Sequence, residues 1–237
     1  MNGTLKTMLA LMLMLVFAVS CNKPDEPDDG GDSHELNGHE YVDLGLPNGT
    51  LWATCNVGAE APEEYGDYYA WGETAPKMLY DWKSYKYGRF IHEQYELNKY
   101  CTDSRYGFDG FVDSLVVLEP DDDVARVCWG AGWRTPSIVE WEELFQNTTG
   151  MWTTLNGVKG WRCTASNGNS IFLPAAGYWW EDVLNANLGL YWSRSVNKEF
   201  PYRAWGFHFN SDSGHLCGSS DRNRGQAVRA VFSNSDF

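Results

Sequence analysis

The sequence predicts an α+β fold in which small antiparallel sheets and two helices are joined by long loops. Most of the chain after residue 36 consists of short apolar–polar runs punctuated by Gly, Pro and Asn, a pattern typical of antiparallel strands joined by turns. Two stretches instead carry helix-start signals followed by apolar residues at helical spacing. The length of this part, residues 37–237, suits one domain.

The first and the middle strand regions are predicted to be hairpins. Residues 40–59, EYVDLGLPNGTLWATCNVGA, alternate around a Pro-Asn-Gly turn. Residues 160–180 hold two strand-like runs joined by Asn167-Gly168, a pair that favours a tight hairpin turn. Residues 78–110 are rich in Tyr and poor in aliphatic side chains, so we expect a long irregular excursion over the core.

The first predicted helix lies in residues 119–130, EPDDDVARVCWG. Acids precede its apolar segment and Gly130 follows its last turn. Acidic residues at a helix N-terminus act as caps and favour the helix dipole. The alternative interpretation of Asp121–Asp123 is a calcium site.

The second predicted helix lies in residues 133–145, WRTPSIVEWEELF. Ser137 and Glu140 match a capping box, in which each of the two side chains accepts a hydrogen bond from the backbone N–H of the other residue. The apolar residues then fall on one face, while Glu142 and Glu143 point to solvent. That apolar face consists of Ile138, Trp141, Leu144 and Phe145.

The C-terminal part is predicted to alternate strands with one polar loop. The strands are GLYWSRS (189–195), AWGFHF (204–209) and QAVRAVF (226–232). In the second strand the alternate aromatic residues share one buried face, and in the third the apolar residues on both faces suit a central strand. Between them, residues 210–224 (NSDSGHLCGSSDRNR) are small and polar, and we expect a surface loop.

The N-terminus indicates export. Lys6 precedes an apolar run from Met8 to Val19, and a small residue comes before Cys21, which is the pattern of a secretory signal peptide over residues 1–20 and is too short to span a membrane. The ending AVSC resembles a bacterial lipobox, which implies that Cys21 is lipidated. The alternative is an ordinary signal peptide with an incidental cysteine.

Residues 21–36 are predicted to be an extended tether, because six acids and one Lys leave almost nothing apolar to bury. An acidic run directly after the lipidated cysteine resembles the surface-export signal of Bacteroidetes lipoproteins. This resemblance implies an outer-membrane protein whose domain faces the cell surface; the alternative is a domain in the periplasm. The lipid would be the only membrane contact.

Charge and cysteine content exclude two classes of function. The net charge is −14, and an acidic protein is a poor partner for nucleic acid. After Cys21 the remaining cysteines show no zinc-ligand spacing, and their odd number requires a free thiol or an intermolecular bond. They are Cys55, Cys101, Cys128, Cys163 and Cys217.

Four motifs resemble one group of proteins. WRTPSIVEWEELF resembles the R-x-P-[ST]-x-x-E-W-E motif of the formylglycine-generating-enzyme/sulfatase-modifying superfamily, and SIFLPAAGY, GLYWSRS and RGQAVRAV resemble motifs of the related Bacteroidetes and Fibrobacter paralogous lipoprotein domains. The resemblance covers about residues 40–231 and implies a C-type-lectin-like fold. Oxidases of that superfamily use a C-terminal cysteine pair, whereas here Cys163 lies in a predicted strand and Cys217 in the polar segment, with no closely spaced pair. We therefore expect no oxidase chemistry, and no motif of a catalytic triad is present.

Residues 210–224 also resemble the diversified segment of retroelement-variable proteins with a C-type-lectin-like fold. Adenine mutagenesis of AAC-type codons cannot produce Lys, Glu, Gln, Trp or Met, and this segment contains none of them. The resemblance implies a variable ligand-binding surface.

These observations predict a non-catalytic cell-surface protein that binds a protein or a glycan through its C-terminal loops. The alternatives are a relative of the formylglycine-generating oxidases and a fimbria-associated adhesin component. No cofactor is expected. The sequence contains no calcium-binding motif, and it leaves both calcium binding and the oligomeric state open. The predicted contact residues are Tyr191, Arg194, Asn197, Tyr202, His208, Asn210, Ser211, Asp212, Ser213, His215, Ser219, Asp221, Arg222 and Asn223.

The charge of this end differs from that of the whole chain. Residues 189–229 contain six basic residues against three acidic ones, which predicts a local patch able to meet an acidic partner. Within it, Arg229 is expected to be structural because it lies in a strand. The basic residues are Arg194, Lys198, Arg203, Arg222, Arg224 and Arg229.

Overall fold

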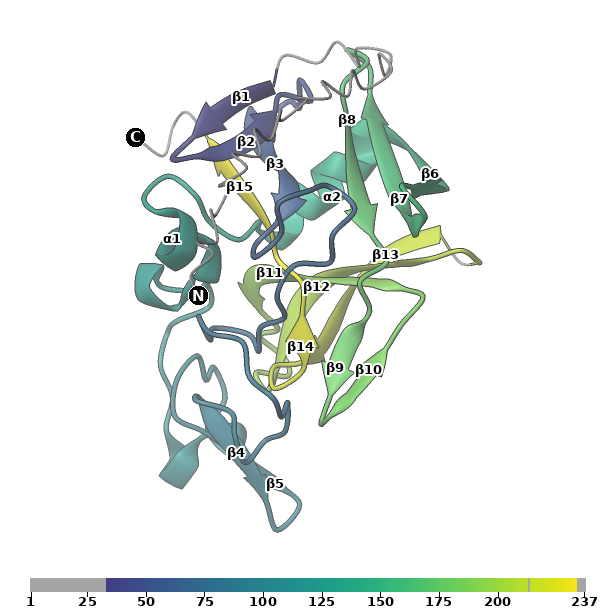
Figure 1. Cartoon of the computed structure of the whole chain (residues 1–237). Helices are drawn as coiled ribbons and strands as arrows, with labels where there is room; N and C mark the ends of the chain where they lie inside the picture. The colour runs from purple at the N-terminus through teal and green to yellow at the C-terminus, as the bar shows by residue number, and fades with distance from the viewer. Residues whose placement is uncertain (1–32, 213, 234–237) are drawn as a thin grey trace, which may run out of the picture. The chain divides into compact units, whose positions relative to one another are not determined.

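The structure, a computed structural model, describes residues 33–212 and 214–233. The predicted signal peptide, Cys21 and nearly all of the tether lie outside these residues, as does Ser213. The described residues fall within one compact unit, Gly31–Phe237, and form several small antiparallel sheets with two α-helices (Figure 1). This arrangement confirms the α+β class. Over these residues no helix combines the length and apolar character that crossing a membrane requires.

A four-stranded sheet joins the two ends of the described chain. Its order is β1 (Ser33–Leu36), β2 (His39–Val42), β3 (Thr50–Asn56) and β15 (Arg229–Ser233). The pairing of β2 with β3 confirms the first predicted hairpin. The turn closes through the backbone N–H of Gly49, which donates to the carbonyl oxygen of Leu46 at 2.9 Å.

The prediction of one central strand for residues 226–232 is wrong. The segment divides into β14 (Gly225–Gln226) and β15, and β15 is at the end of its sheet. Its residues are nevertheless buried, because a second segment covers the outer side: Arg134 and Val231 exchange two backbone hydrogen bonds of 2.9 Å. Because both faces of β15 are buried, its sequence has the apolar pattern of a central strand although it lies at the end of its sheet.

Both predicted helices are confirmed. In α1 (Val124–Trp129) Asp123 caps the N-terminus by accepting from the Ala125 N–H at 3.2 Å. In α2 (Ile138–Asn147) both halves of the Ser137–Glu140 capping box are present. Single 3₁₀ turns cover Ser104–Tyr106, Phe108–Gly110 and Pro120–Asp122.

Four further sheets complete the described chain. The pairing of β7 with β8 around Gly168, whose φ is +91°, confirms the second predicted hairpin. The sheets, in spatial order, are β6 (Thr148–Leu155), β7 (Val158–Ala165) and β8 (Ser170–Pro174); β10 (Val183–Asn185), β9 (Tyr178–Trp180) and β14; β11 (Gly189–Val196), β12 (Arg203–Asn210) and β13 (Gly214–Asp221); and β4 (Gly88–Ile91) with β5 (Gln94–Leu97).

The prediction of a surface loop for residues 210–224 is wrong for most of the segment. Gly214–Asp221 form β13, which pairs with β12 along its whole length. Small residues make this close pairing feasible: a Cβ on Gly218 would lie 2.9 Å from Nδ1 of His208. The preference of a residue for a strand depends strongly on what its side chain packs against. Residues 214–221 contain no run of aliphatic residues, so their sequence carries no local sign of a strand.

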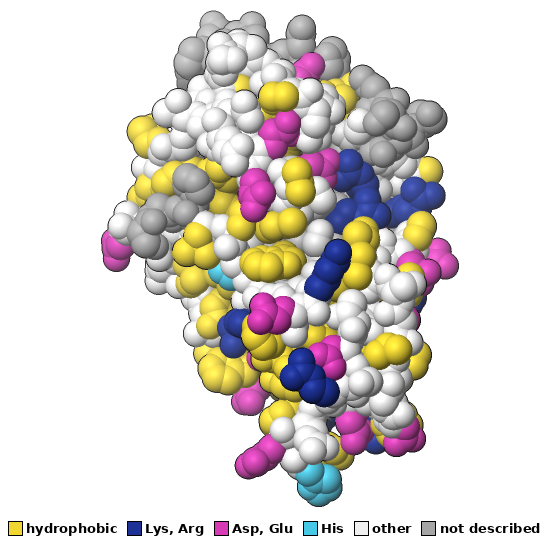
Figure 2. Space-filling view, turned by 180° about the vertical axis from the view of Figure 1, so that it is seen from behind, with side chains coloured by type: hydrophobic (Ala, Val, Ile, Leu, Met, Phe, Trp, Pro, Cys, Tyr) yellow, Lys and Arg dark blue, Asp and Glu magenta, His cyan; other side chains and the backbone are white. Residues whose placement is uncertain are grey.

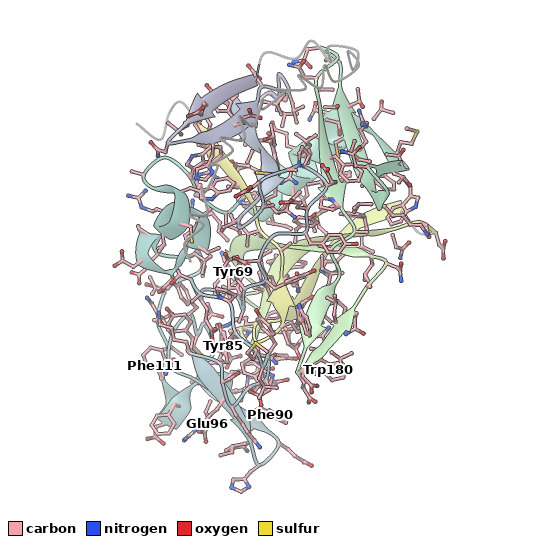
Figure 3. The ribbon with its side chains drawn as sticks, in the orientation of Figure 1. Tyr69, Tyr85, Phe90, Glu96, Phe111 and Trp180 are labelled. Carbon is pink, nitrogen blue, oxygen red and sulfur yellow. The ribbon has the colours of Figure 1, made fainter. Side chains whose placement is uncertain are left out.

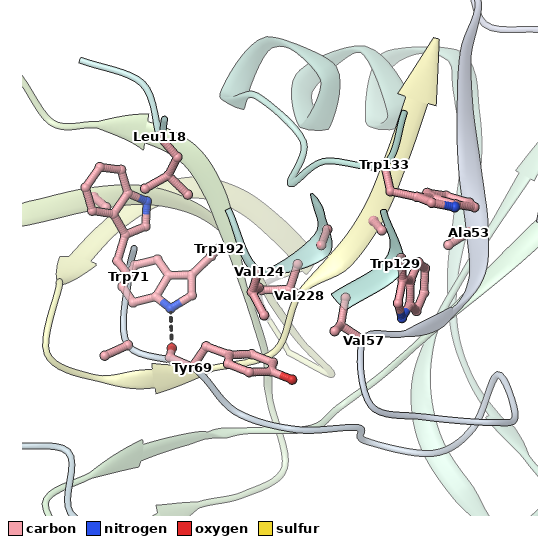
Figure 4. Close-up of a cluster of buried hydrophobic side chains, with 14 of the residues drawn as sticks. Ala53, Val57, Tyr69, Trp71, Leu118, Val124, Trp129, Trp133, Trp192 and Val228 are labelled. Atoms are coloured by element: carbon pink, nitrogen blue, oxygen red, sulfur yellow. Dashed lines mark hydrogen bonds between the residues drawn. The ribbon is translucent and has the colours of Figure 1, made fainter. Parts of the chain in front are cut away.

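Two aromatic clusters form the core. One cluster contains Trp71, Trp133 and Trp192 together with residues of β3, β15 and α1 (Figure 4). There the indole N–H of Trp192 donates to the carbonyl oxygen of Tyr69 at 2.7 Å. In the second cluster, Phe207 of β12 packs on Trp141 of α2, with ring centroids 5.0 Å apart. Burying Trp and Tyr with their polar atoms satisfied stabilises a core rich in aromatic residues.

The expected excursion over residues 78–110 is present and carries the hairpin β4–β5 at its far end, where Phe90 and Glu96 lie (Figure 3). Arg222 holds it to the body of the domain. Its guanidinium is completely buried and all five of its N–H groups have an acceptor. The acceptors are the Tyr85 hydroxyl at 2.9 Å and the carbonyl oxygens of Tyr87, Lys99, Tyr100 and Pro201 at 2.8–3.4 Å.

We expect Arg222→Lys to destabilise the fold strongly. A lysine ammonium has three donors in place of a planar fork of five, so buried carbonyl oxygens would lose their partners. The loss should be about 3–5 kcal/mol, measured as the free energy of unfolding in denaturant. Arg126→Lys, an exposed position on α1, is the matched control and should change stability by less than about 0.5 kcal/mol. Equal stability of the two variants would contradict the anchoring role of Arg222.

Candidate functional site

Surface charge alone does not mark a binding site. On the face seen in Figure 2, acidic and basic side chains are interspersed with exposed hydrophobic ones. A concave feature is more informative, because small ligands bind where a pocket removes them from water.

One groove lies over the C-terminal sheet, and we call it the C-terminal groove. Its volume is about 370 Å³, within the size range of small-ligand sites. The floor comes from β11, β12 and β13, and Tyr178 of β9 with Arg224, just before β14, supplies a wall. The lining residues are Tyr178, Leu188, Leu190, Arg203, His208, Phe209, Asn210, Leu216, Ser219, Ser220 and Arg224.

Strand alternation separates the groove from the core. Phe207 and Phe209 point to the core side of β12, where Phe207 stacks on Phe145 of α2 with ring centroids 4.0 Å apart. The residue between them, His208, therefore points to the groove. The register of the sheet aligns His208 with Leu190 on β11 and Leu216 on β13. A row across three strands thus forms the floor.

His208 is a neutral side chain in this floor. Burial, together with the positive charges of Arg224 and Arg203, lowers the pKa of its imidazole to about 4. At neutral pH the ring therefore offers one donor and one acceptor. Its Nε2 lies 3.5 Å from the hydroxyl oxygen of Ser220, so polar ligand groups above the floor meet uncharged partners.

The two arginines of the groove differ in their partners. Nε of Arg203 lies 3.4 Å from Oδ1 of Asp221, its neighbour across β12 and β13. The guanidinium of Arg224 instead lies over two rings, 5.2 Å from the centroid of Tyr178 and 5.4 Å from that of Trp180. Within residues 33–212 and 214–233 this guanidinium has neither a hydrogen-bond acceptor nor an ion-pair partner. Its donors are therefore held in place and open to a ligand.

The structure places three predicted contact residues in the groove: His208, Asn210 and Ser219. Asp221 pairs with Arg203 at the edge of the groove, and Ser211 and Asp212 are exposed in the turn between β12 and β13. Ser213 and the side chain of His215 lie outside the described residues.

Four other predicted contact residues are buried, so the expectation that they meet a ligand is corrected. The Tyr191 hydroxyl donates to the Pro174 carbonyl oxygen at 2.7 Å inside the core, and the Asn223 amide donates to the Tyr80 carbonyl oxygen at 3.0 Å. Asn197 stabilises the turn before β12 by accepting from two backbone N–H groups. Arg222 anchors the excursion. Polar side chains in small-residue segments can equally satisfy buried backbone groups, which sequence alone does not distinguish.

The remaining two predicted contacts lie away from the groove. Tyr202 stacks on Tyr95 of the excursion with ring centroids 3.9 Å apart. Arg194 donates to the Leu118 carbonyl oxygen at 3.3 Å.

The expectation that Arg229 is structural is confirmed, because it is buried and donates to Asn56, Ala53 and Phe172. Of the predicted basic patch, Arg203 and Arg224 are the members that line the groove.

Sequence reasoning missed Tyr178, which forms an aromatic wall of the groove, and Trp180, which lies beside it against Arg224. Tyr178 and Trp180 belong to the motif region GYWW, but no local signal shows that β9 pairs with β14. That pairing brings Tyr178 next to Arg224, which is 46 positions away along the chain. Leu190 and Leu216 were missed because single leucines in polar surroundings carry no pattern.

The cysteines and acidic residues offer no visible reactive centre in the described residues. All five cysteines there are free thiols. Burial raises the pKa of Cys163 to about 12; burial, together with the charge of Glu142, raises that of Cys217 to about 11. Such thiols stay protonated at neutral pH and are weak nucleophiles. No group of three or more His, Cys, Asp or Glu in the described chain could hold a metal ion. Asp123 instead accepts from Thr135 and Ala125, as a cap does.

Comparison of the chain with models of protein families, with curated proteins and with solved structures gave no match. The assignment of a function therefore depends on the geometry of the groove and on the motifs of the sequence.

The neutral state of His208 predicts a pH dependence of stability. Its folded pKa of about 4 lies below the ordinary value of 6.5, so between these values the unfolded chain binds a proton that the folded chain does not. Stability contributed by His208 is therefore complete above about pH 6.5 and is lost as the pH falls towards 4. Allowing for solvent screening, the loss should be about 1–2 kcal/mol.

This prediction is measured by denaturant unfolding of the wild type and of His208→Gln at about pH 7 and about pH 4.5. The variant cannot titrate at this position, and the nearby Arg203, Arg224 and Asp221 are unchanged. The variant should therefore lose less stability on acidification than the wild type. Parallel losses in the two proteins would show that His208 does not carry the effect.

Proposed function

We propose that this chain is a lipid-anchored, surface-exposed, non-catalytic protein that binds a glycan in the C-terminal groove. The groove carries the proposal. It has the volume of a small-ligand site, an aromatic wall, and a floor with hydroxyl, amide and imidazole groups. Sugars need this combination, because their ring faces stack on aromatic side chains while their hydroxyl groups need hydrogen-bond partners.

A glycan fits this groove better than the surface of a folded protein. A stable interface between two folded proteins is a broad surface that buries about 800 Å² of each partner. The described recognition groups are instead gathered in one small concavity, with a volume of about 370 Å³. A protein ligand would have to present a narrow projection to reach His208 and Arg224. A sugar chain enters such a site end-on or lengthwise.

The anchor and the fold type are further parts of the proposal. The lipobox-like AVSC before an acidic tether supports lipidation at Cys21 and display on the outer membrane. A C-type-lectin-like fold is supported by the small antiparallel sheets, the two helices, the long excursion and the pairing of β3 with β15, which brings the two ends of the domain together. Such a fold presents its C-terminal segments as a ligand surface.

Oxidase chemistry of the formylglycine-generating type is not proposed. It needs a thiolate, and the raised pKa values of Cys163 and Cys217 oppose its formation.

A fimbria-associated adhesin component is the second candidate, and the open edge of β13 favours it. In the described chain this strand pairs with β12 alone, and before its last residue, Asp221, it contains neither Pro nor a Lys, Arg, Asp or Glu. Edge strands without such residues are prone to pair with another chain. Sedimentation of the full chain in detergent distinguishes the candidates: assembly through this edge predicts oligomers, whereas a groove-binding protein remains functional as a monomer.

The glycan-binding proposal predicts the effect of filling the groove. Leu216 is 51% exposed on the floor, so Leu216→Trp should occupy space without disturbing the core. We expect binding of the full chain, purified in detergent, to a glycan array to fall at least about tenfold, equivalent to about 1.4 kcal/mol. Val127→Trp, equally exposed at 51% on α1, is the matched control and should bind as the wild type does.

Two results would contradict the proposal. One is an array signal that Leu216→Trp leaves unchanged, because binding would then occur elsewhere. The other is a wild-type chain that binds no glycan on the array.

A further inference from the structure

We propose that the ligand of the C-terminal groove is an acidic glycan, with a sugar carboxylate held by Arg224 and a sugar ring stacked on Trp180. This inference rests on the glycan-binding function proposed above and adds the chemical class of the glycan.

The first support is the state of Arg224. A guanidinium normally satisfies its planar fork of donors with carboxylates or carbonyl oxygens, as Arg222 does with five acceptors and Arg229 with three. Arg224 lies half-buried on Tyr178 and Trp180 and has no acceptor among the described residues. Its orientation is set by stacking, while its donors remain available to a ligand.

The second support is the charge balance of the groove. No Asp or Glu is among the described residues that line the groove, and Asp221 at its edge lies beside Arg203. His208 carries no charge at neutral pH because burial lowers its pKa to about 4. Arg224 therefore remains as an uncompensated positive charge within the described groove, on a chain whose net charge is −14. A local charge opposite to that of the whole protein favours an anionic ligand at this point.

The third support is the position of Trp180 beside Arg224. Trp180 is 52% exposed, so a large part of its ring is accessible to a ligand. It lies next to the turn of the β9–β10 hairpin, paired with Val183, and Figure 3 places it at the end of this hairpin. A sugar ring lying on the indole would have a substituent within reach of the guanidinium. The polar side chains of Asn210 and Ser220 line the same groove and would then meet sugar hydroxyl groups.

A carboxylate matches this site better than a phosphate chain does. One planar fork binds one carboxylate through two parallel hydrogen bonds, whereas polyphosphates and nucleic acids require several basic residues along a path. Arg203 has Asp221 as an ion-pair partner, so among the described residues Arg224 is the guanidinium of the groove without one. A hydrogen bond to a charged group contributes more than one to a neutral group, so the carboxylate should dominate selectivity.

The test compares acidic glycans with their neutral counterparts. The full chain in detergent is titrated with oligosaccharides that carry uronate or sialate residues and with the same oligosaccharides after carboxyl reduction. We expect at least one acidic member to bind about tenfold or more tightly than its reduced form. Arg224→Gln should reduce this preference to within about twofold, and Arg224→Lys should leave an intermediate preference because it keeps the charge without the fork.

Arg126→Gln removes the same charge from an exposed position on α1 and should keep the full preference. Thermal unfolding of each variant shows whether it is folded. A carboxylate preference that survives Arg224→Gln would overturn the inference.

Equal binding of acidic and reduced glycans that Leu216→Trp abolishes would also overturn the inference, while leaving the glycan-binding function intact. Absence of binding to every member of both sets would overturn both.

Discussion

The buried guanidinium of Arg222 is the interaction on which the rest of the described structure depends. It follows β13 directly, and its five donors reach segments on three sides: Tyr85 and Tyr87, then Lys99 and Tyr100, then Pro201. Trp71 and Tyr85 lie against the same group, 5.2 and 5.3 Å from its centre. A buried charge without a carboxylate is costly unless its whole hydrogen-bonding capacity is used. Here full use of that capacity fixes an excursion that has few aliphatic residues with which to pack.

The same constraint shapes the groove. Because Arg222 and Asn223 are turned inward, the chain leaves β13 in a defined direction and reaches β14, which pairs with β9. That pairing brings Tyr178 and Trp180 over Arg224. The groove is therefore a consequence of how the excursion is held, since its wall is positioned by the residues just after the anchor.

Residues 210–224 combine two roles that their composition does not separate. Asn210, Leu216, Ser219 and Ser220 line the groove, while Gly218 leaves space for His208 and Arg222 and Asn223 satisfy buried carbonyl oxygens. The resemblance to retroelement-diversified proteins implies exchange throughout this segment. The packing restricts tolerated exchange to the side chains that face the groove or the β12–β13 turn, because substitutions at Gly218 or Arg222 would disturb the sheet or the excursion.

The sequence by itself determined the features that depend on neighbouring residues. Both helices follow from their caps, the two early hairpins from Pro-Asn-Gly and Asn167-Gly168, and the buried face of β12 from the alternation of Phe207 and Phe209. The structural role of Arg229 also followed from its place in a strand. Each of these signals operates within a few residues, where steric and hydrogen-bonding preferences of the backbone are sufficient.

Tertiary structure alone decided which polar residues are buried, that residues 214–221 are a strand, and that Tyr178 and Trp180 meet Arg224. Arg222 and Arg224 show the reason, since they are two positions apart in the same polar segment. One finds five buried acceptors that come from residues 85–100 and 201; the other finds two aromatic rings from β9. Which partner each arginine meets depends on pairings between distant strands, and no local preference encodes those pairings.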